Sequence, residues 1–178
     1  MFGNKVSRHW AGFADASAVT FDVCYTSWVT NPARLKPVAT SASSESAGSE
    51  AQKATNGFLG SDISHCFSST AETGPWWMAD LGESKTISQV RVHTRQDGVS
   101  SDFLSVEARL GDSSVHDSNP EFGVNAGTPH VAAEVVFAPS EAMSGRYLSM
   151  KSLDGAAGPL TICDVEILEE HNDALKKK

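Results

Sequence analysis

The sequence predicts an all-β protein, an antiparallel β-sandwich of the jelly-roll type. About seven or eight short segments with alternating apolar residues are separated by turns rich in Gly, Pro and Ser. Almost no segment has the 3.6-residue apolar repeat of an amphipathic helix. The chain has 178 residues, of which 40% are hydrophobic, and this is enough for one domain with its own core.

The first predicted elements are an edge strand and a single helical turn. Residues 35–42 form the strand candidate, and Pro37 places it at a sheet edge or at a strand start. The helical turn covers residues 51–55. It is expected to end at Asn56-Gly57, because both residue types tolerate a positive φ.

The stretch 74–97 is predicted to form a β-hairpin with its turn at 82–85. Side chains alternate along both strands, so that one face is apolar and the other is polar or basic. The apolar face carries Trp77, Ala79, Leu81, Val90 and Val92. The opposite face of the second strand carries Gln89, Arg91, His93 and Arg95, and it faces water or a ligand.

Four further strands are predicted after this hairpin. They cover 105–110, 131–138, 145–152 and 160–168. Each is short and is bounded by turn residues, which is typical of a sandwich rather than of a helical protein.

Residues 31–169 are expected to form one domain, preceded by an extension (1–30) and followed by a polar tail (170–178). The pair Asn31-Pro32 marks the boundary. The extension contains a strand candidate that would either join the main sheet or belong to a preceding domain. It is also a candidate contact for a protein partner.

Composition excludes several classes of function. A net charge of −8 disfavours binding to nucleic acid or to anionic membranes. No apolar run reaches the ~18 residues of a transmembrane segment. Residues 1–10 have no apolar core, so no signal peptide is visible. The protein is therefore expected to be intracellular, or to be a mature chain or a piece of a longer secreted one.

Sequence motifs of common enzymes are missing, and the protein is expected not to be an enzyme. The chain has no His-Glu-x-x-His, no Gly-x-Ser-x-Gly and no glycine-rich phosphate loop between a strand and a helix. Its acidic residues are scattered, as in any acidic β-protein.

The three cysteines are Cys24, Cys66 and Cys163, and their spacing fits no zinc motif. An odd count is compatible with one disulfide and one free thiol. Three reduced thiols are the alternative if the chain is cytosolic.

Several short motifs follow one another between residues 31 and 169. They are Lys36-Pro37-Val38, Ala54-Thr55-Asn56-Gly57, Cys66, Pro75-Trp76-Trp77-Met78-Ala79-Asp80-Leu81-Gly82, Arg95-Gln96-Asp97, Gly145-Arg146-Tyr147-Leu148 and Ile162-Cys163-Asp164-Val165-Glu166. Their order resembles that of the F-type (fucose-binding) lectins, within the wider galactose-binding-like, discoidin and coagulation-factor C-domain sandwiches. The resemblance implies the same β-sandwich.

The resemblance also implies a disulfide between Cys66 and Cys163, which leaves Cys24 as the odd thiol. Closing a loop of this length would contribute about 4–5 kcal/mol in the chain-entropy model. Such a bond implies an oxidising compartment, and therefore an extracellular or cell-surface location.

The sugar site of these lectins resembles a basic triad in which Arg and His donate hydrogen bonds to sugar hydroxyls. Arg95 and Asp97 match its Arg-x-Asp motif, in which the Asp holds the Arg. This chain departs from the pattern at the other two positions, where Ser68 replaces the His and Asp102 replaces the second basic residue. The alternative for Arg95 and Asp97 is a structural ion pair.

Two further residues are candidates for sugar contact. His65 precedes the loop cysteine and could turn toward the site, with an ordinary loop histidine as the alternative. Phe103 is a loop aromatic, a residue type that the wider family uses to touch ligands. Loop aromatics also commonly cover the core.

The resemblance further implies a calcium ion near the turn that contains Asn56 and Gly57. Candidate ligands are the side-chain oxygen of Asn56, the carboxylate of Asp164 and the backbone carbonyl of Cys163. The alternative is an empty turn held by backbone hydrogen bonds.

Together these features predict a non-catalytic module of the fucose- or galactose-binding type, whose partner is a glycan or glycoprotein. The alternative is a member of the same fold that has lost sugar binding and serves protein interaction or assembly. Fold alone does not decide between the two.

Overall fold

The computed structural model describes residues 33–59, 62–95, 101–126 and 134–170. Every strand pairing in this part of the chain is antiparallel. The strands are β1 (Arg34–Leu35), β2 (Ala39–Ala42), β3 (Phe67–Ser68), β4 (Trp76–His93), β5 (Val106–Gly111), β6 (Glu121–Asn125), β7 (Glu134–Phe137), β8 (Met143–Ser152), β9 (Thr161–Ile162) and β10 (Asp164–Glu169). The predicted antiparallel β-sandwich is confirmed.

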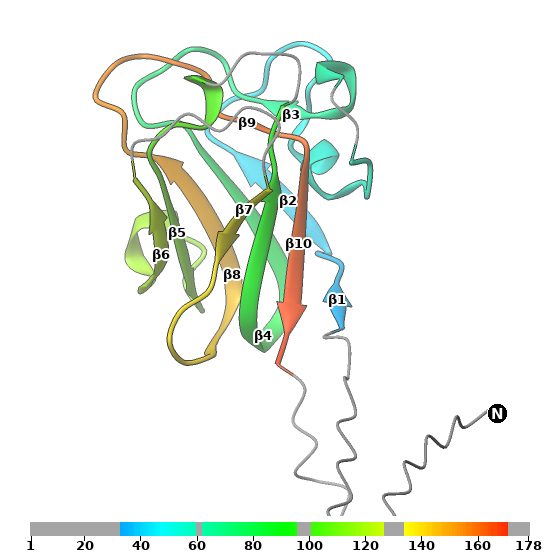
Figure 1. Ribbon diagram of the computed structural model, residues 1–178, viewed down its shortest axis with the longest axis vertical. Helices are drawn as coiled ribbons and strands as arrows, with labels where there is room; N and C mark the ends of the chain where they lie inside the picture. The colour runs from blue at the N-terminus through cyan, green and yellow to red at the C-terminus, as the bar shows by residue number, and fades with distance from the viewer. Residues whose placement is uncertain (1–32, 60–61, 96–100, 127–133, 171–178) are drawn as a thin grey trace, which may run out of the picture.

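Two layers of strands form the sandwich, and the long strand β4 belongs to both. Its first half lies between β2 and β8, and the sheet continues through β5 to β6. Its second half lies between β10 and β7, with β1 beyond β10. In Figure 1, β4 descends in one layer, bends at the lower end of the molecule and ascends in the other.

The predicted hairpin over residues 74–97 is therefore wrong in its pairing. The two halves of β4 pair with other strands, and the register shifts between Asp80 and Lys85, where the chain bulges. Gly82 has a φ of +83°, a conformation that favours glycine. Residues 82–85, predicted as a turn between two strands, lie within the continuous strand β4 at this bulge, where the chain passes from one layer to the other.

The core lies between the layers and contains the apolar face predicted for 74–97. Trp77, Ala79, Val90 and Val92 are all fully buried, and Leu81 is 7% exposed. Their main partners from other strands are Val106, Ala108, Leu110, Leu148, Met150, Val165 and Ile167. The period-two pattern therefore predicted the buried face, although it did not predict the pairing.

The helical turn expected at 51–55 is present as the 3₁₀ turn η1 (Ala51–Thr55). Its Ala51 and Ala54 are buried, and the indole nitrogen of Trp77 donates a 2.9 Å hydrogen bond to the Ala51 carbonyl. Gly57 follows with a φ of +78°, as the Asn-Gly pair predicts. This turn is thereby fixed to the core.

Two predicted strands are broken in the structure. Residues 35–42 form β1 and β2 separately, with Pro37 in the gap, because proline cannot donate a ladder hydrogen bond. Residues 160–168 form β9 and β10, which are separated at Cys163.

Short 3₁₀ turns fill the connections between the strands. They are η2 (Ile63–His65), η3 (Ser101–Phe103) and η4 (His116–Ser118). No helix in the described ranges is long and apolar enough to cross a membrane. The extension over 1–30 lies outside the described residues, as does the tail after Glu170.

Candidate functional site

The loop end of the sandwich is held together by the β3–β9 ladder and a disulfide, near the top of Figure 1. Cys66 and Cys163 are bonded to each other and fully buried. The next positions along the ladder pair Phe67 with Ile162, and then Ser68 with Thr161. The predicted disulfide is thus present, and it fixes the strands that carry Ser68.

A row of four polar side chains begins at Ser68. Its hydroxyl lies 3.0 Å from the hydroxyl of Thr161, which donates a 3.2 Å hydrogen bond to Oδ2 of Asp102. The same carboxylate oxygen accepts a 2.8 Å hydrogen bond from Nη1 of Arg95. The Ser68 hydroxyl also lies 3.3 Å from the Ser69 carbonyl, to which it can donate.

The four residues of this row come from four segments. Ser68 is in β3, Thr161 is in β9, Asp102 is in η3, and Arg95 follows the end of β4. The structure thus brings together the three positions that the resemblance assigned to the sugar site, Ser68, Arg95 and Asp102.

Burial makes this row different from an open basic site. Ser68, Thr161 and Asp102 retain 5%, 1% and 7% of their surface, and the Arg95 side chain retains 13%. A charge-assisted hydrogen bond in such surroundings is stronger than one at the surface. The Arg95 guanidinium is therefore held by an acid within the protein.

Other predicted sugar contacts lie in different environments. The exposed ring of His65 stacks on Phe58 with ring centres 4.0 Å apart, and its Nδ1 lies 3.0 Å from the hydroxyl of Ser64. Phe103 is 2% exposed and packs in the hydrophobic core, so its ring has no face left for a sugar. Asp97 lies outside the described residues.

Thr161 was missed by sequence reasoning, and so was the role of Asp102 as a partner of Arg95. A signal for Thr161 did exist. If Cys66 and Cys163 are bonded across antiparallel strands, the residue two after the first cysteine faces the residue two before the second. Ser68 and Thr161 stand at those positions.

The residues expected at a calcium site form another cluster near the turn after η1. Asp164 is fully buried, and its two oxygens accept hydrogen bonds from the backbone N–H of Gly57 at 3.0 Å and from Arg34 at 2.6 Å. The side-chain oxygen of Asn56 accepts from the backbone N–H of Phe58 at 2.7 Å. These oxygens are satisfied by donors from the protein itself.

One group in this region has the composition of a metal site. Ligand atoms of His93, Asp164 and Glu166 all lie within 4.8 Å of one another. Arg34 lies against both carboxylates, at 2.6 Å from Asp164 and 3.1 Å from Glu166. Calcium needs about 6–8 oxygen ligands, and this arrangement does not fit it.

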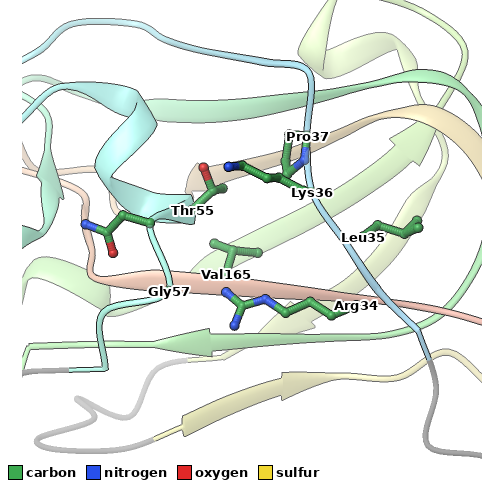
Figure 2. Close-up of a pocket in the computed structure, with 8 residues that line it drawn as sticks. Arg34, Leu35, Lys36, Pro37, Thr55, Gly57 and Val165 are labelled. Atoms are coloured by element: carbon green, nitrogen blue, oxygen red, sulfur yellow. The ribbon is translucent and has the colours of Figure 1, made fainter.

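A cavity of about 250 Å³ borders this cluster. Figure 2 shows Arg34 extending from β1 past Val165 toward Gly57, along one wall of the cavity. The rest of the lining comes from the segment after Arg34 and from the end of η1 with its turn, and it includes none of the row that begins at Ser68. These residues are Leu35, Lys36, Pro37, Thr55, Asn56 and Gly57.

Residues 53–150, more than half of the chain, match the family described as NedA-like, galactose-binding domain, of the F5/F8 type C group. The chain belongs to this galactose-binding domain family. No curated protein matches it.

Solved structures with similar folds include several lectins and binding modules. A fucolectin from striped bass (Morone saxatilis) serum is 26% identical with a TM-score of 0.68, over 74% of this chain and 46% of that lectin. A fucose-binding module of Streptococcus pneumoniae is 19% identical with a TM-score of 0.66, over 78% of this chain and 96% of that module. The present chain thus spans less than half of the striped bass lectin.

A family 32 carbohydrate-binding module of Clostridium perfringens NanJ, solved with galactose, is 14% identical with a TM-score of 0.62, over 74% of this chain and 93% of that module. At such identities the second and third likenesses show the fold alone. Members of this galactose-binding domain family, and the solved structures similar to the present chain, are mainly non-catalytic carbohydrate-binding modules. One of those structures, of AlyQ, combines such a module with an alginate lyase domain.

Proposed function

We propose that this protein is a non-catalytic carbohydrate-binding module of the fucose or galactose type, which binds its sugar at the Arg95–Asp102 pair. The observation that carries the proposal is the row itself. Ser68 meets Arg95 and Asp102, which lie further along the chain, through Thr161 at the loop end of the sandwich. Membership of the galactose-binding domain family supports the choice of ligand class.

The chemistry of the pair suits a sugar with two neighbouring hydroxyls. A guanidinium donates hydrogen bonds, and a carboxylate accepts them. One sugar hydroxyl would accept from Arg95, and the next would donate to Asp102. This mode differs from a triad of donors, because Asp102 requires a hydroxyl proton from the ligand.

The proposed site also includes residues from the flanking loops. We assign Asp97 to the support of Arg95, and His65 to the rim, where its exposed ring is accessible. Ser68 acts through Thr161, because the two hydroxyls lie 3.0 Å apart and both residues are buried. Phe103 supports the site from within the core.

A second candidate function, protein interaction, is favoured by the contact between Arg95 and Asp102 within the same row. Because Arg95 already has an acidic partner, part of its donor capacity is used inside the protein. A sandwich with such a site could serve instead as a protein interaction or assembly module, with the extension over 1–30 as a further contact. The two functions differ in whether the purified protein binds free sugar.

Calorimetric titration with L-fucose and with galactose tests the proposal. We expect binding by the natural chain and its loss in Arg95→Ala. The matched control is Arg109→Ala, because Arg109 forms a comparable pair with Glu107 at 2.7 Å on β5. Equal loss in both variants, or no heat from either sugar at millimolar concentration, would contradict the proposal and favour the protein-interaction function.

Calcium has no part in the proposed binding step. The candidate ligand Asp164 is already bonded to Arg34, and no step needs a metal at the Arg95–Asp102 pair. The disulfide between Cys66 and Cys163 is compatible with an extracellular location, where glycans and glycoproteins are accessible.

A further inference from the structure

Two positively charged side chains, Arg34 of β1 and Lys53 of η1, lie near the turn after η1. Each contacts oxygen atoms of a kind that metal ions also use as ligands. We infer that Arg34 and Lys53 are built-in cations that replace a bound metal here, so that the turn is held without calcium. The inference concerns the turn around Asn56 and Gly57, and it is independent of sugar binding.

Arg34 provides the first cation. Its two terminal nitrogens contact two carboxylates of β10, Asp164 at 2.6 Å and Glu166 at 3.1 Å. Asp164 is fully buried, so an uncompensated charge there would be strongly unfavourable. The second oxygen of Asp164 accepts from the Gly57 N–H, so the Arg34–Asp164 pair connects β1, β10 and the turn.

Lys53 provides the second cation, inside η1. Its ammonium donates hydrogen bonds to the backbone carbonyls of Gly48 and Ser64, the latter at 2.7 Å, and lies 3.7 Å from a carboxylate oxygen of Glu50. Backbone carbonyls and a carboxylate are also the oxygen ligands that calcium uses. The ammonium joins the loop before η1 to the 3₁₀ turn η2, and such cross-linking of two segments is the role of a structural metal.

Asn56 closes the turn with hydrogen bonds that involve both polar atoms of its side chain. Its side-chain amide donates to the His65 carbonyl at 2.9 Å, while its oxygen accepts from the Phe58 N–H at 2.7 Å. Both polar atoms of the Asn56 side chain are therefore bonded within the protein, although the residue itself is exposed. A calcium ion bound to Asn56 and Asp164 would have to displace the Phe58 and Gly57 N–H donors and the Arg34 guanidinium.

Arg34 balances only one of the two negative charges on Asp164 and Glu166. Next to them, Nε2 of His93 is buried, has no hydrogen-bond partner within the described structure and lies 4.0 Å from Glu166. Removal of Arg34 would leave two carboxylates and an imidazole nitrogen facing one another. Such a group binds a divalent transition metal such as zinc.

Thermal unfolding of the full chain tests the inference directly. With the natural protein, millimolar calcium and excess EDTA should both leave the melting temperature unchanged, because a ligand that binds only the folded state would raise it. A rise with calcium or a fall with EDTA would overturn the inference.

Two variants test the cations themselves. Arg34→Ala should lower the melting temperature by roughly 5–10 °C, since a buried carboxylate loses its partner. In this variant, zinc should restore part of the loss, and the additional change His93→Ala should abolish the restoration. Lys53→Met should lower the melting temperature as well, whereas Lys36→Met, at an exposed neighbour, should not.

The expected zinc effect separates a cation site from ordinary packing. A loss in Arg34→Ala that zinc does not reduce would show that Arg34 acts only through its local contacts, and would contradict the inference. If Arg34→Ala does not fold, Arg34→Gln provides the same comparison, since a glutamine removes the charge but can still donate a hydrogen bond to Asp164.

Discussion

Nη1 of Arg95 and Oδ2 of Asp102 lie 2.8 Å apart, and the same oxygen accepts a hydrogen bond from Thr161. The pair joins the end of β4 to η3, with its charges largely withdrawn from water. It therefore has a structural contribution that can be measured separately from any ligand.

Removal of either member of this pair should destabilise the fold. We expect Arg95→Ala to reduce the free energy of unfolding by about 2–4 kcal/mol, because the buried Asp102 carboxylate loses the 2.8 Å charge-assisted hydrogen bond from Arg95. The double variant Arg95→Ala/Asp102→Ala should lose less than the sum of the two single losses. Urea unfolding of the natural chain, the two single variants and the double variant measures the interaction free energy of Arg95 with Asp102. Strictly additive losses would show that the interaction between the two side chains contributes nothing to stability.

The disulfide should dominate the stability of the loop end. Replacing Cys66 and Cys163 together by alanine is expected to lower the free energy of unfolding by about 4–5 kcal/mol, given the 97-residue separation. Guanidinium unfolding provides the measurement. Thiol titration of the denatured, unreduced protein should detect one free cysteine, Cys24, and detection of three would contradict the bond.

Gly145 should not tolerate even a methyl group. A Cβ placed there would lie 2.5 Å from the backbone nitrogen and 2.6 Å from the Cα of Gly111 on β5. Gly145→Ala should cost about 1–3 kcal/mol, because two paired strands must move apart. Gly155→Ala is the control, since a Cβ at Gly155 meets nothing within 4 Å. Equal melting temperatures for the two variants would refute this expectation.

Acid should weaken the contact between Asp80 and Arg146. Hydrogen bonds from Arg146 at 2.8 and 2.9 Å lower the pKa of Asp80, assisted by the Gly82 N–H and opposed by burial. In the unfolded chain this carboxyl returns to its ordinary pKa of about 3.9. The unfolded state then binds more protons, so the stabilisation is complete above that pH and is lost as the pH falls through the lower folded pKa.

Melting temperatures measured from neutral pH to pH 2 test this expectation. Asp80→Asn should be less stable than the natural chain at neutral pH, and the difference should shrink in acid. Asp112→Asn is a suitable control, because Asp112 is exposed and contacts Arg146 only at its backbone N–H. A constant difference between Asp80→Asn and the natural chain across the pH range would exclude Asp80 as a source of acid sensitivity.

The sequence predicted the fold class well because a strand with one buried face shows alternating apolar and polar residues over a few positions. Val90 and Val92 alternate with Arg91 and His93, and the first two are buried in the structure. Which strands pair with each other cannot be seen from such a short stretch of sequence. Residues 74–97 satisfy a hairpin pattern equally well, and only the strands on either side of β4 decide that its halves enter different layers.

The site was predicted in position but not in its contacts. The resemblance identified Ser68, Arg95 and Asp102, but a change from a basic residue to Asp102 reverses the sign of the charge that faces Arg95. Whether such an acid points toward the arginine depends on the path of η3, which the motif spacing does not encode. Phe103, in the same turn, is directed into the core by that path.

The course of β4 has a consequence for how the sandwich unfolds. One continuous strand supplies the centre of both layers, so separation of the layers requires the loss of hydrogen bonds on both sides of the same strand. Neither layer can survive as a folded intermediate while the other melts. The domain should therefore lose its structure in a single cooperative transition, with the same midpoint whether it is followed by backbone or by tryptophan signals.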